Sequence, residues 1–115
     1  MEKKELLVYV GTYTEDILFG TGQILEGQGE GIHIYRMDRA PGALCPHDTA
    51  REIKNPSYLA FHPTGRSLYA VNELKSYKGE PTGTLSAFSL DADTGRLRFI
   101  NKAATHGTDP CHVTL

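Results

Sequence analysis

The stretch NPSYLAFHPTGRSLYAVNEL, from Asn55 to Leu74, sets the interpretation of the whole sequence. A proline loop leads into a short apolar run, and the tight turn His62–Gly65 leads into a second run that ends on Asn72 and Glu73. Glycine tolerates the positive φ that such a turn needs, so two antiparallel strands joined by a hairpin are predicted. The opening of the stretch recurs at Asp109–Leu115, DPCHVTL, which indicates a repeat.

Two further segments recur in the same order along the chain. Residues 32–38, IHIYRMD, resemble residues 85–91, LSAFSLD, and a loop with Gly-x-Leu follows each of them at a constant offset of 53 positions. Residues 7–11, LVYVG, resemble residues 68–72, LYAVN. Because several segments recur in one order, the chain is predicted to consist of copies of one supersecondary unit.

Each copy is predicted to contain four short antiparallel strands, and this all-β pattern is typical of a β-propeller blade. The complete copy has strands at about Ser57–His62, Ser67–Asn72, Thr84–Leu90 and Arg96–Lys102. The first copy has only three, at about Leu6–Gly11, Gly31–Met37 and Thr49–Lys54, and a final strand is expected at Cys111–Leu115. The chain is therefore predicted to be a partial propeller, with blade one (6–54) lacking its inner strand, a complete blade two (55–103) and the start of blade three (109–115).

The bulk composition excludes several classes of partner. The chain has 115 residues, a net charge of −2 and a pI near 6.2, which give no electrostatic reason to expect nucleic acid or an anionic membrane. The apolar run Leu6–Val10 is too short for a signal sequence or a membrane span. Two cysteines, Cys45 and Cys111, do not make a disulfide framework, so a cytoplasmic location with free thiols is expected.

Loop order predicts where a site could form. In a blade, the loop that enters the innermost strand and the loop between the second and third strands open at the same end, around the channel. Polar side chains at a channel mouth suit a ligand site. Grouped at this end are His112 and Glu73 as candidate catalytic residues, and Tyr13, Ser57 and Asn72 as candidate substrate-binding residues. Gly65 and Asp93 are expected at the opposite end, and the nearest cations to the site are Lys75 and Lys78.

Each candidate also has a purely structural interpretation. Asn55 and Asp109 precede proline and are typical Asx-turn formers. Asn72 can serve the backbone of its loop, and Glu73 can be a solvated carboxylate. For His112 the functional interpretation is kept, because the ordinary pKa of an imidazole suits a general base near neutral pH.

Metal and dinucleotide sites are not predicted. The segment Asp91-x-Asp93-x-Gly95 lacks the later ligands of a calcium loop, so a hairpin turn is expected there. The Cys-His pairs at Cys45 and Cys111 are expected at opposite ends of the strands, which argues against a shared zinc ion. The glycines of residues 20–31 precede a strand rather than a helix, so a loop at the channel mouth is expected.

The segments YVGTYT, GIHIYRMD, NPSYLAFHPTGRSLYAVNE, GTLSAFSLDADTGRL and GTDPCHVTL resemble the N-terminal part of the seven-bladed β-propeller lactonase family, which includes bacterial propeller-type 6-phosphogluconolactonases. The resemblance covers nearly the whole chain except the loop around residues 15–30. It implies a longer parent protein that hydrolyses 6-phosphogluconolactone to the open acid in the pentose phosphate pathway, without a cofactor. It also implies that further histidines and arginines of the site lie beyond Leu115.

Alternatives to this hydrolase remain open at the level of sequence. A propeller without catalytic activity could bind a partner through the same face, and a related lactone-processing or lactonising enzyme would use the same scaffold. The chain alone is expected to be inactive. Because Leu6–Gly11 and Cys111–Leu115 would lack neighbouring strands, we also expect it to self-associate through exposed sheet edges.

Overall fold

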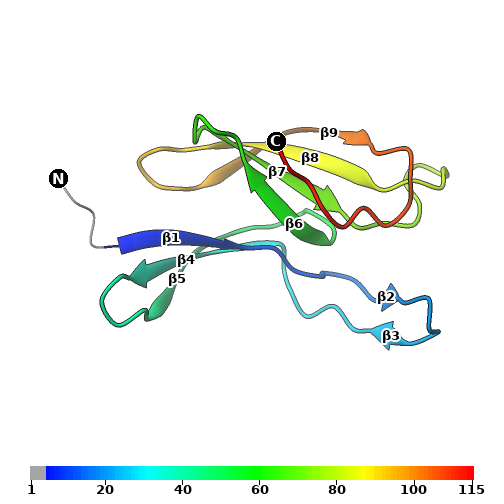
Figure 1. Ribbon diagram of the computed structural model, residues 1–115, viewed down its shortest axis with the longest axis horizontal. Helices are drawn as coiled ribbons and strands as arrows, with labels where there is room; N and C mark the ends of the chain where they lie inside the picture. Colours follow the sequence, from blue (N-terminus) through cyan, green and yellow to red (C-terminus); the bar gives the residue numbers. More distant parts are fainter. Residues whose placement is uncertain (1–4) are drawn as a thin grey trace.

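The structure is a computed structural model that describes residues 5–115, and it consists of antiparallel strands joined by turns and loops (Figure 1). No helix occurs among the described residues, and hence none that is long and apolar enough to cross a membrane. The all-β prediction is confirmed. The strands are β1 (Glu5–Val10), β2 (Ile17–Leu18), β3 (Ile24–Leu25), β4 (Ile32–Asp38), β5 (Leu44–Ala50), β6 (Pro56–Phe61), β7 (Ser67–Asn72), β8 (Thr84–Leu90) and β9 (Leu97–Ala104).

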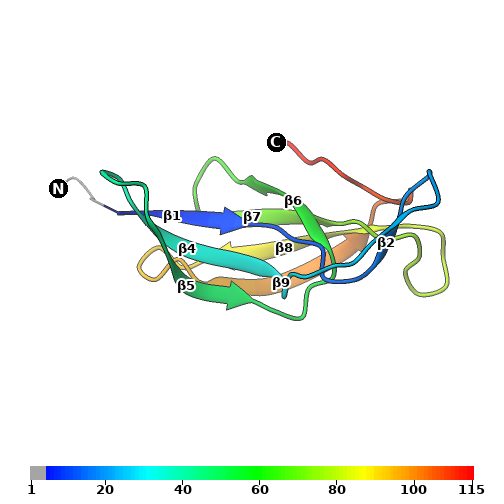
Figure 2. The same ribbon diagram turned by 90° about the horizontal axis from the view of Figure 1, so that it is seen from below.

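Two sheets form the body of the molecule. Strands β1, β4 and β5 make a three-stranded antiparallel sheet in that order, and β6 to β9 make a four-stranded one in chain order. Figure 1 shows the sheets as two layers, and Figure 2, turned by 90°, shows one sheet lying across the other. The predicted pair of sheets, one of three strands and one of four, is confirmed.

The repeat in sequence is also a repeat in backbone geometry. In the outer strand of each sheet one residue is skipped in the pairing register, His47 in β5 and Ile100 in β9. The break lies beside Tyr35 in the first sheet and beside Phe88 in the second. These positions are again 53 residues apart. A β-bulge bends a strand and increases its twist, so both outer strands curve at the same point.

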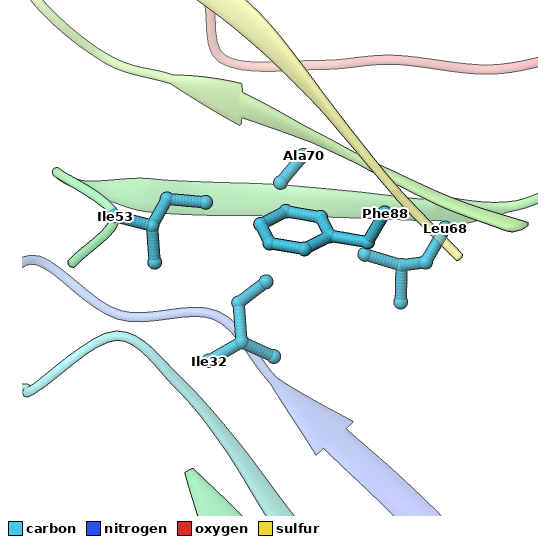
Figure 3. Close-up of a cluster of buried hydrophobic side chains, with 5 residues drawn as sticks. All are labelled: Ile32, Ile53, Leu68, Ala70 and Phe88. Carbon is cyan, nitrogen blue, oxygen red and sulfur yellow. The ribbon is translucent and has the colours of Figure 1, made fainter. Parts of the chain in front are cut away.

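The apolar core lies between the two sheets (Figure 3). Ile32 of β4 faces Leu68 and Ala70 of β7 and Phe88 of β8, while Ile53 reaches the same cluster from the connection between the sheets. Ile32, Leu68 and Ala70 have no exposed surface. Full burial of an aliphatic side chain contributes about 1.5–3 kcal/mol to folding, so this cluster holds the sheets together.

Strand alternation explains which face of β8 meets the core. Thr84, Ser86 and Phe88 are buried against the first sheet, while Leu85 and Ala87 on the other face are half-buried. The residues equivalent to Leu85 and Ala87 in the first sheet are Ile32 and Ile34, which the second sheet covers completely. The face of the second sheet that points away from the first sheet is therefore equivalent to the face with which the first sheet packs on the second.

Two of the predicted strands are wrong: one lies at different residues, and the other does not form. The third strand of the first copy, expected at Thr49–Lys54, is β5 at Leu44–Ala50. It is an edge strand, the position in a sheet where a residue without an N–H, such as Pro46, is tolerated. The expected strand Cys111–Leu115 does not form, because no strand in residues 5–115 lies beside it to exchange backbone hydrogen bonds.

The long connection between β1 and β4 contains a hairpin that the sequence did not predict. Strands β2 and β3 pair antiparallel through Ile17 with Leu25 and Leu18 with Ile24. Figure 1 shows this hairpin extending beyond the end of the first sheet. The tip is closed by a hydrogen bond from the Gly22 amide to the Phe19 carbonyl at 2.9 Å.

Candidate functional site

The loops of the molecule separate into two ends. The turns of residues 39–43, 62–66 and 91–96 lie at one end in Figure 1, so Gly65 and Asp93 belong there. The β2–β3 hairpin, the loop of residues 73–83 and the segment that follows β9 lie at the other end, here called the site end. The structure places Tyr13, Ser57 and Glu73 together at the site end.

A buried carboxylate is the centre of this group. The hydroxyl of Tyr13 donates to Glu73 at 3.1 Å from Oε1 and 3.2 Å from Oε2, and the Ser57 hydroxyl donates to Oε1 at 2.9 Å. The Glu73 residue is only 9% exposed. The three side chains come from the loop after β1, from β6 and from the loop after β7, so both sheets contribute to one polar cluster.

Local irregularity in β6 orients Ser57. The β6–β7 register shifts between Pro56 and Tyr58, which leaves Ser57 as the extra residue of a bulge. A bulge redirects the side chain it carries. The Ser57 hydroxyl therefore reaches Glu73, which lies one residue beyond the end of β7.

The environment of Tyr13 is anionic. Burial raises the pKa of the Tyr13 phenol above its ordinary value of 10.0, and the hydrogen bond to Glu73 raises it further. Electrostatic interactions with Glu73, Cys111 and Asp109 raise the pKa of Tyr13 further. Tyr13 is therefore a neutral hydrogen-bond donor to Glu73 at physiological pH. Its oxygen retains lone pairs that can accept a hydrogen bond from a ligand hydroxyl.

Asn55 holds the cluster in place. Its Oδ1 accepts from the backbone amides of Thr14 at 2.9 Å and Glu15 at 3.0 Å, and its Nδ2 donates to the Glu73 carbonyl at 3.2 Å. The residue has φ of 45° and is only 3% exposed. Asparagine tolerates this left-handed conformation better than most residues. Asn55 thus ties the loop that carries Tyr13 to the loop that carries Glu73.

Asn72 serves the scaffold of the second sheet. Its Oδ1 accepts from the hydroxyls of Thr84 at 2.8 Å and Ser86 at 2.7 Å, and its Nδ2 donates to the Lys54 carbonyl at 2.8 Å. At 3% exposure the side chain is enclosed by these partners. The predicted substrate-binding residue Asn72 is therefore placed beside the cluster, with its polar atoms directed into the interior.

His112 lies at the same end but outside the Glu73 cluster. Its ring is tilted against that of Tyr58, with the centroids 4.6 Å apart, and the residue is exposed. Among the described residues, no hydrogen bond joins His112 to Glu73. The imidazole is accessible to solvent, whereas Glu73 is enclosed.

The predicted cations do not enter the cluster. Lys75 pairs with Asp109 at 2.9 Å, and the Lys78 ammonium lies 5.4 Å from the centre of the Tyr77 ring. The part of the site built by residues 5–115 is thus rich in carboxylates and hydroxyls. In the same range, no three His, Cys, Asp or Glu side chains gather as a metal ion would require.

Sequence reasoning missed the role of Asn55 and Thr14. The sequence suggests that Asn55 forms a local turn, but its side chain bonds to Thr14 and Glu15, about forty residues earlier, and to the Glu73 carbonyl, 18 residues later. The Thr14 hydroxyl also accepts from the Asn55 amide at 3.0 Å. The sequence signal for this role was that the Asx-Pro pair of Asn55 recurs at Asp109. Both of these residues have positive φ.

Comparisons with known proteins agree with this architecture. The family model described as "Lactonase, 7-bladed beta-propeller" matches residues 7–115. The chain is 31% identical over 107 residues to a 6-phosphogluconolactonase of Bacillus subtilis, covering 93% of this chain and 26% of that protein. It is 27% identical to a 6-phosphogluconolactonase of Formosa agariphila, covering 94% of this chain and 27% of the relative.

Solved structures give the same result. A crystal structure from Bacteroides uniformis superposes with a TM-score of 0.78 at 34% identity, covering 98% of this chain and 28% of the other. The periplasmic gluconolactonase of Pseudomonas aeruginosa superposes with a TM-score of 0.70 at 38% identity, covering 90% and 26%. The chain spans about a quarter of the length of these relatives. With its repeated antiparallel sheet unit and a family match over nearly its whole length, the chain belongs to the seven-bladed β-propeller lactonase family.

Proposed function

We propose that the protein to which this chain contributes hydrolyses a sugar-phosphate lactone, 6-phosphogluconolactone, to 6-phosphogluconate, a step of the pentose phosphate pathway. The family match and the two 6-phosphogluconolactonase relatives support this substrate class. The observation that carries the proposal is the buried Glu73 carboxylate held by Tyr13 and Ser57 at the site end.

The cluster suits the polyol part of such a substrate. Sugar hydroxyls donate hydrogen bonds, and the oxygens of Glu73, Tyr13 and Ser57 are acceptors in a partly desolvated setting. The same negative charge would repel a phosphate group. We therefore assign these three residues to the hydroxyl-bearing end of the lactone, and assign the phosphate to cationic groups of other blades.

His112 is the proposed general base. In lactone hydrolysis the oxygen of a water molecule attacks the ring carbonyl while a base takes its proton. The tetrahedral intermediate then expels the ring oxygen, which is protonated to give the hydroxyl of the open acid. A neutral imidazole near pH 7 can take and return this proton, and His112 is exposed at the site end. Glu73 is the alternative base, since its carboxylate lies in the same region.

The experiment uses the complete propeller, with 6-phosphogluconolactone generated in the assay and its hydrolysis measured above the spontaneous rate. His112→Asn is expected to lower kcat by about 10²–10⁴-fold if it is the base. Tyr13→Phe and Ser57→Ala are expected to raise KM by about fivefold to tenfold, the cost of one neutral hydrogen bond. Turnover at the wild-type rate in Glu73→Ala and His112→Asn would refute the assignment. A propeller without activity that binds the acid would support a binding module instead.

We also propose a cytoplasmic location, for which the free, exposed thiols of Cys45 and Cys111 are the support. Thiols in this state persist in a reducing compartment. Fractionation of cells followed by thiol labelling of the protein tests this, and recovery in a periplasmic fraction would contradict it.

A further inference from the structure

A groove of about 930 Å³ opens between the two sheets at the site end. One wall is formed by the start of the β2–β3 hairpin and by residues 51–55, and the other by the loop of residues 72–78 with parts of β8 and β9. Glu73 lines one part of the groove, while Tyr13, Ser57 and His112 do not line it. Both walls belong to this chain, and the groove shares only Glu73 with the cluster assigned to the lactone.

Aromatic and aliphatic side chains form the apolar part of the groove. Ile53 and Phe88 are buried and face one another in Figure 3. Phe99 packs edge to face on Phe88, with the ring centroids 5.8 Å apart, yet it remains 53% exposed. An exposed aromatic ring next to a buried one offers a surface on which a flat apolar group can pack.

Two lysines border the groove around one tyrosine. The ammonium groups of Lys78 and Lys102 lie 5.4 Å and 5.1 Å from the centre of the Tyr77 ring. Within residues 5–115, neither ammonium has a carboxylate within ion-pair distance. Two like charges beside one ring, without a counter-ion, create a local positive potential that an anion would relieve.

The other cations of the groove are already neutralised. Arg51 pairs with Glu30 at 3.0 Å, Lys54 with Glu15 at 3.9 Å and Lys75 with Asp109 at 2.9 Å. Of the remaining carboxylates, Asp16 and Glu52 belong to the wall opposite Lys78 and Lys102. Glu73 lies on the same wall as Lys78, and its carboxylate accepts hydrogen bonds from Tyr13 and Ser57. The charge distribution therefore directs an anionic group toward Tyr77 and away from the first sheet.

We propose that this groove binds an organic anion that carries a phosphate or sulfonate group on a flat apolar body. The anionic group lies between Lys78 and Lys102, and the apolar body packs on Phe99 and Phe88. The volume falls within the range of small-molecule sites, about 300–1,000 Å³. Because Tyr13 and Ser57 do not line the groove, such a ligand would bind beside the Glu73 cluster rather than within it. This inference goes beyond the proposed lactonase activity and does not depend on it.

The test uses 1-naphthyl phosphate as the probe, with inorganic phosphate and 1-naphthol as its two halves. Binding is followed by NMR titration of the backbone amides of the complete propeller, because the chain alone is expected to self-associate. Saturable shifts are expected at Tyr77, Lys78, Phe99 and Lys102, with an affinity at least about tenfold above that of either half. The double variant Lys78→Gln/Lys102→Gln is expected to weaken binding by at least about tenfold, equivalent to about 1.4 kcal/mol.

Arg66→Gln provides the matched control, because Arg66 is an exposed cation in the turn at the opposite end. It should leave the affinity unchanged, and the amide spectra establish that each variant is folded. Shifts confined to other parts of the chain, or an affinity equal in the wild type and the double variant, would overturn the proposal. Neither outcome bears on lactone hydrolysis, which is measured on the complete propeller with a different substrate.

Discussion

Asn55 and Asp109 occupy the same position in consecutive repeats. Both precede a proline, both have positive φ, 45° and 53°, and both bond to the backbone of the loop after β7. They differ in what their side chains do. The buried Asn55 side chain bonds to three backbone groups, whereas the Asp109 carboxylate forms one partly exposed ion pair with Lys75. One local conformation thus serves two different purposes.

Asn55→Ala is expected to destabilise the chain far more than Asp109→Ala. The first change leaves the Thr14 and Glu15 amides and the Glu73 carbonyl without their partner, at about 1–3 kcal/mol for each group that stays buried. The second removes an ion pair worth about 0–1 kcal/mol. Both variants lose a residue suited to positive φ, so their difference isolates the hydrogen bonds. Urea unfolding measures it, and equal losses would contradict the role given to Asn55.

The Tyr13–Glu73 pair is expected to make stability decrease at alkaline pH. Because the pKa of Tyr13 is raised on folding, the folded state holds this proton more tightly than the unfolded state does. The contribution is fully present below pH 10 and is lost as the pH rises through the higher folded pKa. Glu73→Gln removes the charge and should bring the pKa of Tyr13 down, although burial keeps it raised.

Tyrosinate absorbance measures this titration. Subtracting the curve of Tyr13→Phe from that of the wild type isolates Tyr13 among the six tyrosines. Tyr9, whose pKa burial also raises, bonds to the Gly95 carbonyl and serves as an internal comparison. If Glu73→Gln left the Tyr13 titration where it is in the wild type, the hydrogen bond would not exist in solution.

Gly95→Ala is expected to separate the sheets, whereas Gly65→Ala is expected to be mild. Both glycines have φ of 73°, so both changes introduce similar backbone strain of about 1 kcal/mol. A Cβ at Gly65 meets open space, but a Cβ at Gly95 would lie 2.1 Å from Leu7 Cδ1 and 2.9 Å from the Tyr9 hydroxyl. Overpacking adds about 1–3 kcal/mol. Thermal unfolding of the two variants gives the comparison, and equal midpoints would show that β1 does not pack on this turn.

The sequence predicts the repeat well because strand alternation and turn chemistry act locally. The hairpin turn at Gly65 and the long strand β8 are visible from a few adjacent residues. Strand β5 was misplaced because Pro46 and polar neighbours hide an edge strand, yet the offset of 53 that links Leu44 to Leu97 would have placed it correctly. The repeat carried more information there than the local composition.

The candidate site was predictable in part for a related reason. Loop order brings Tyr13, Ser57 and Glu73 to one end, because connections fix the direction of each strand. The inward orientation of Asn72 was not predictable, since it depends on hydroxyls of Thr84 and Ser86 twelve or more residues later. The β2–β3 hairpin lies in the region outside the repeat, where no second copy guided the interpretation.

The last prediction concerns the chain of residues 1–115 studied alone, which we expect to self-associate through β1. Within the described residues, β1 pairs only with β4, so its other edge presents unpaired backbone groups. Leu6, Leu7 and Val10 on this strand are each 39% exposed, and an apolar edge strand is a template for pairing with another chain.

Leu6→Lys places a charge on that edge, where lysine opposes strand pairing. It is expected to shift the mass measured by light scattering toward the monomer. Ile24→Lys is the control, because Ile24 is an exposed apolar residue, at 65%, on the separate β2–β3 hairpin. The control removes a more exposed apolar side chain than Leu6 without touching the β1 edge, so it should leave the mass unchanged. A wild-type chain that is monomeric at every concentration would contradict the expected self-association. Two variants that dissociate equally would show that general apolar exposure, rather than the β1 edge, governs it.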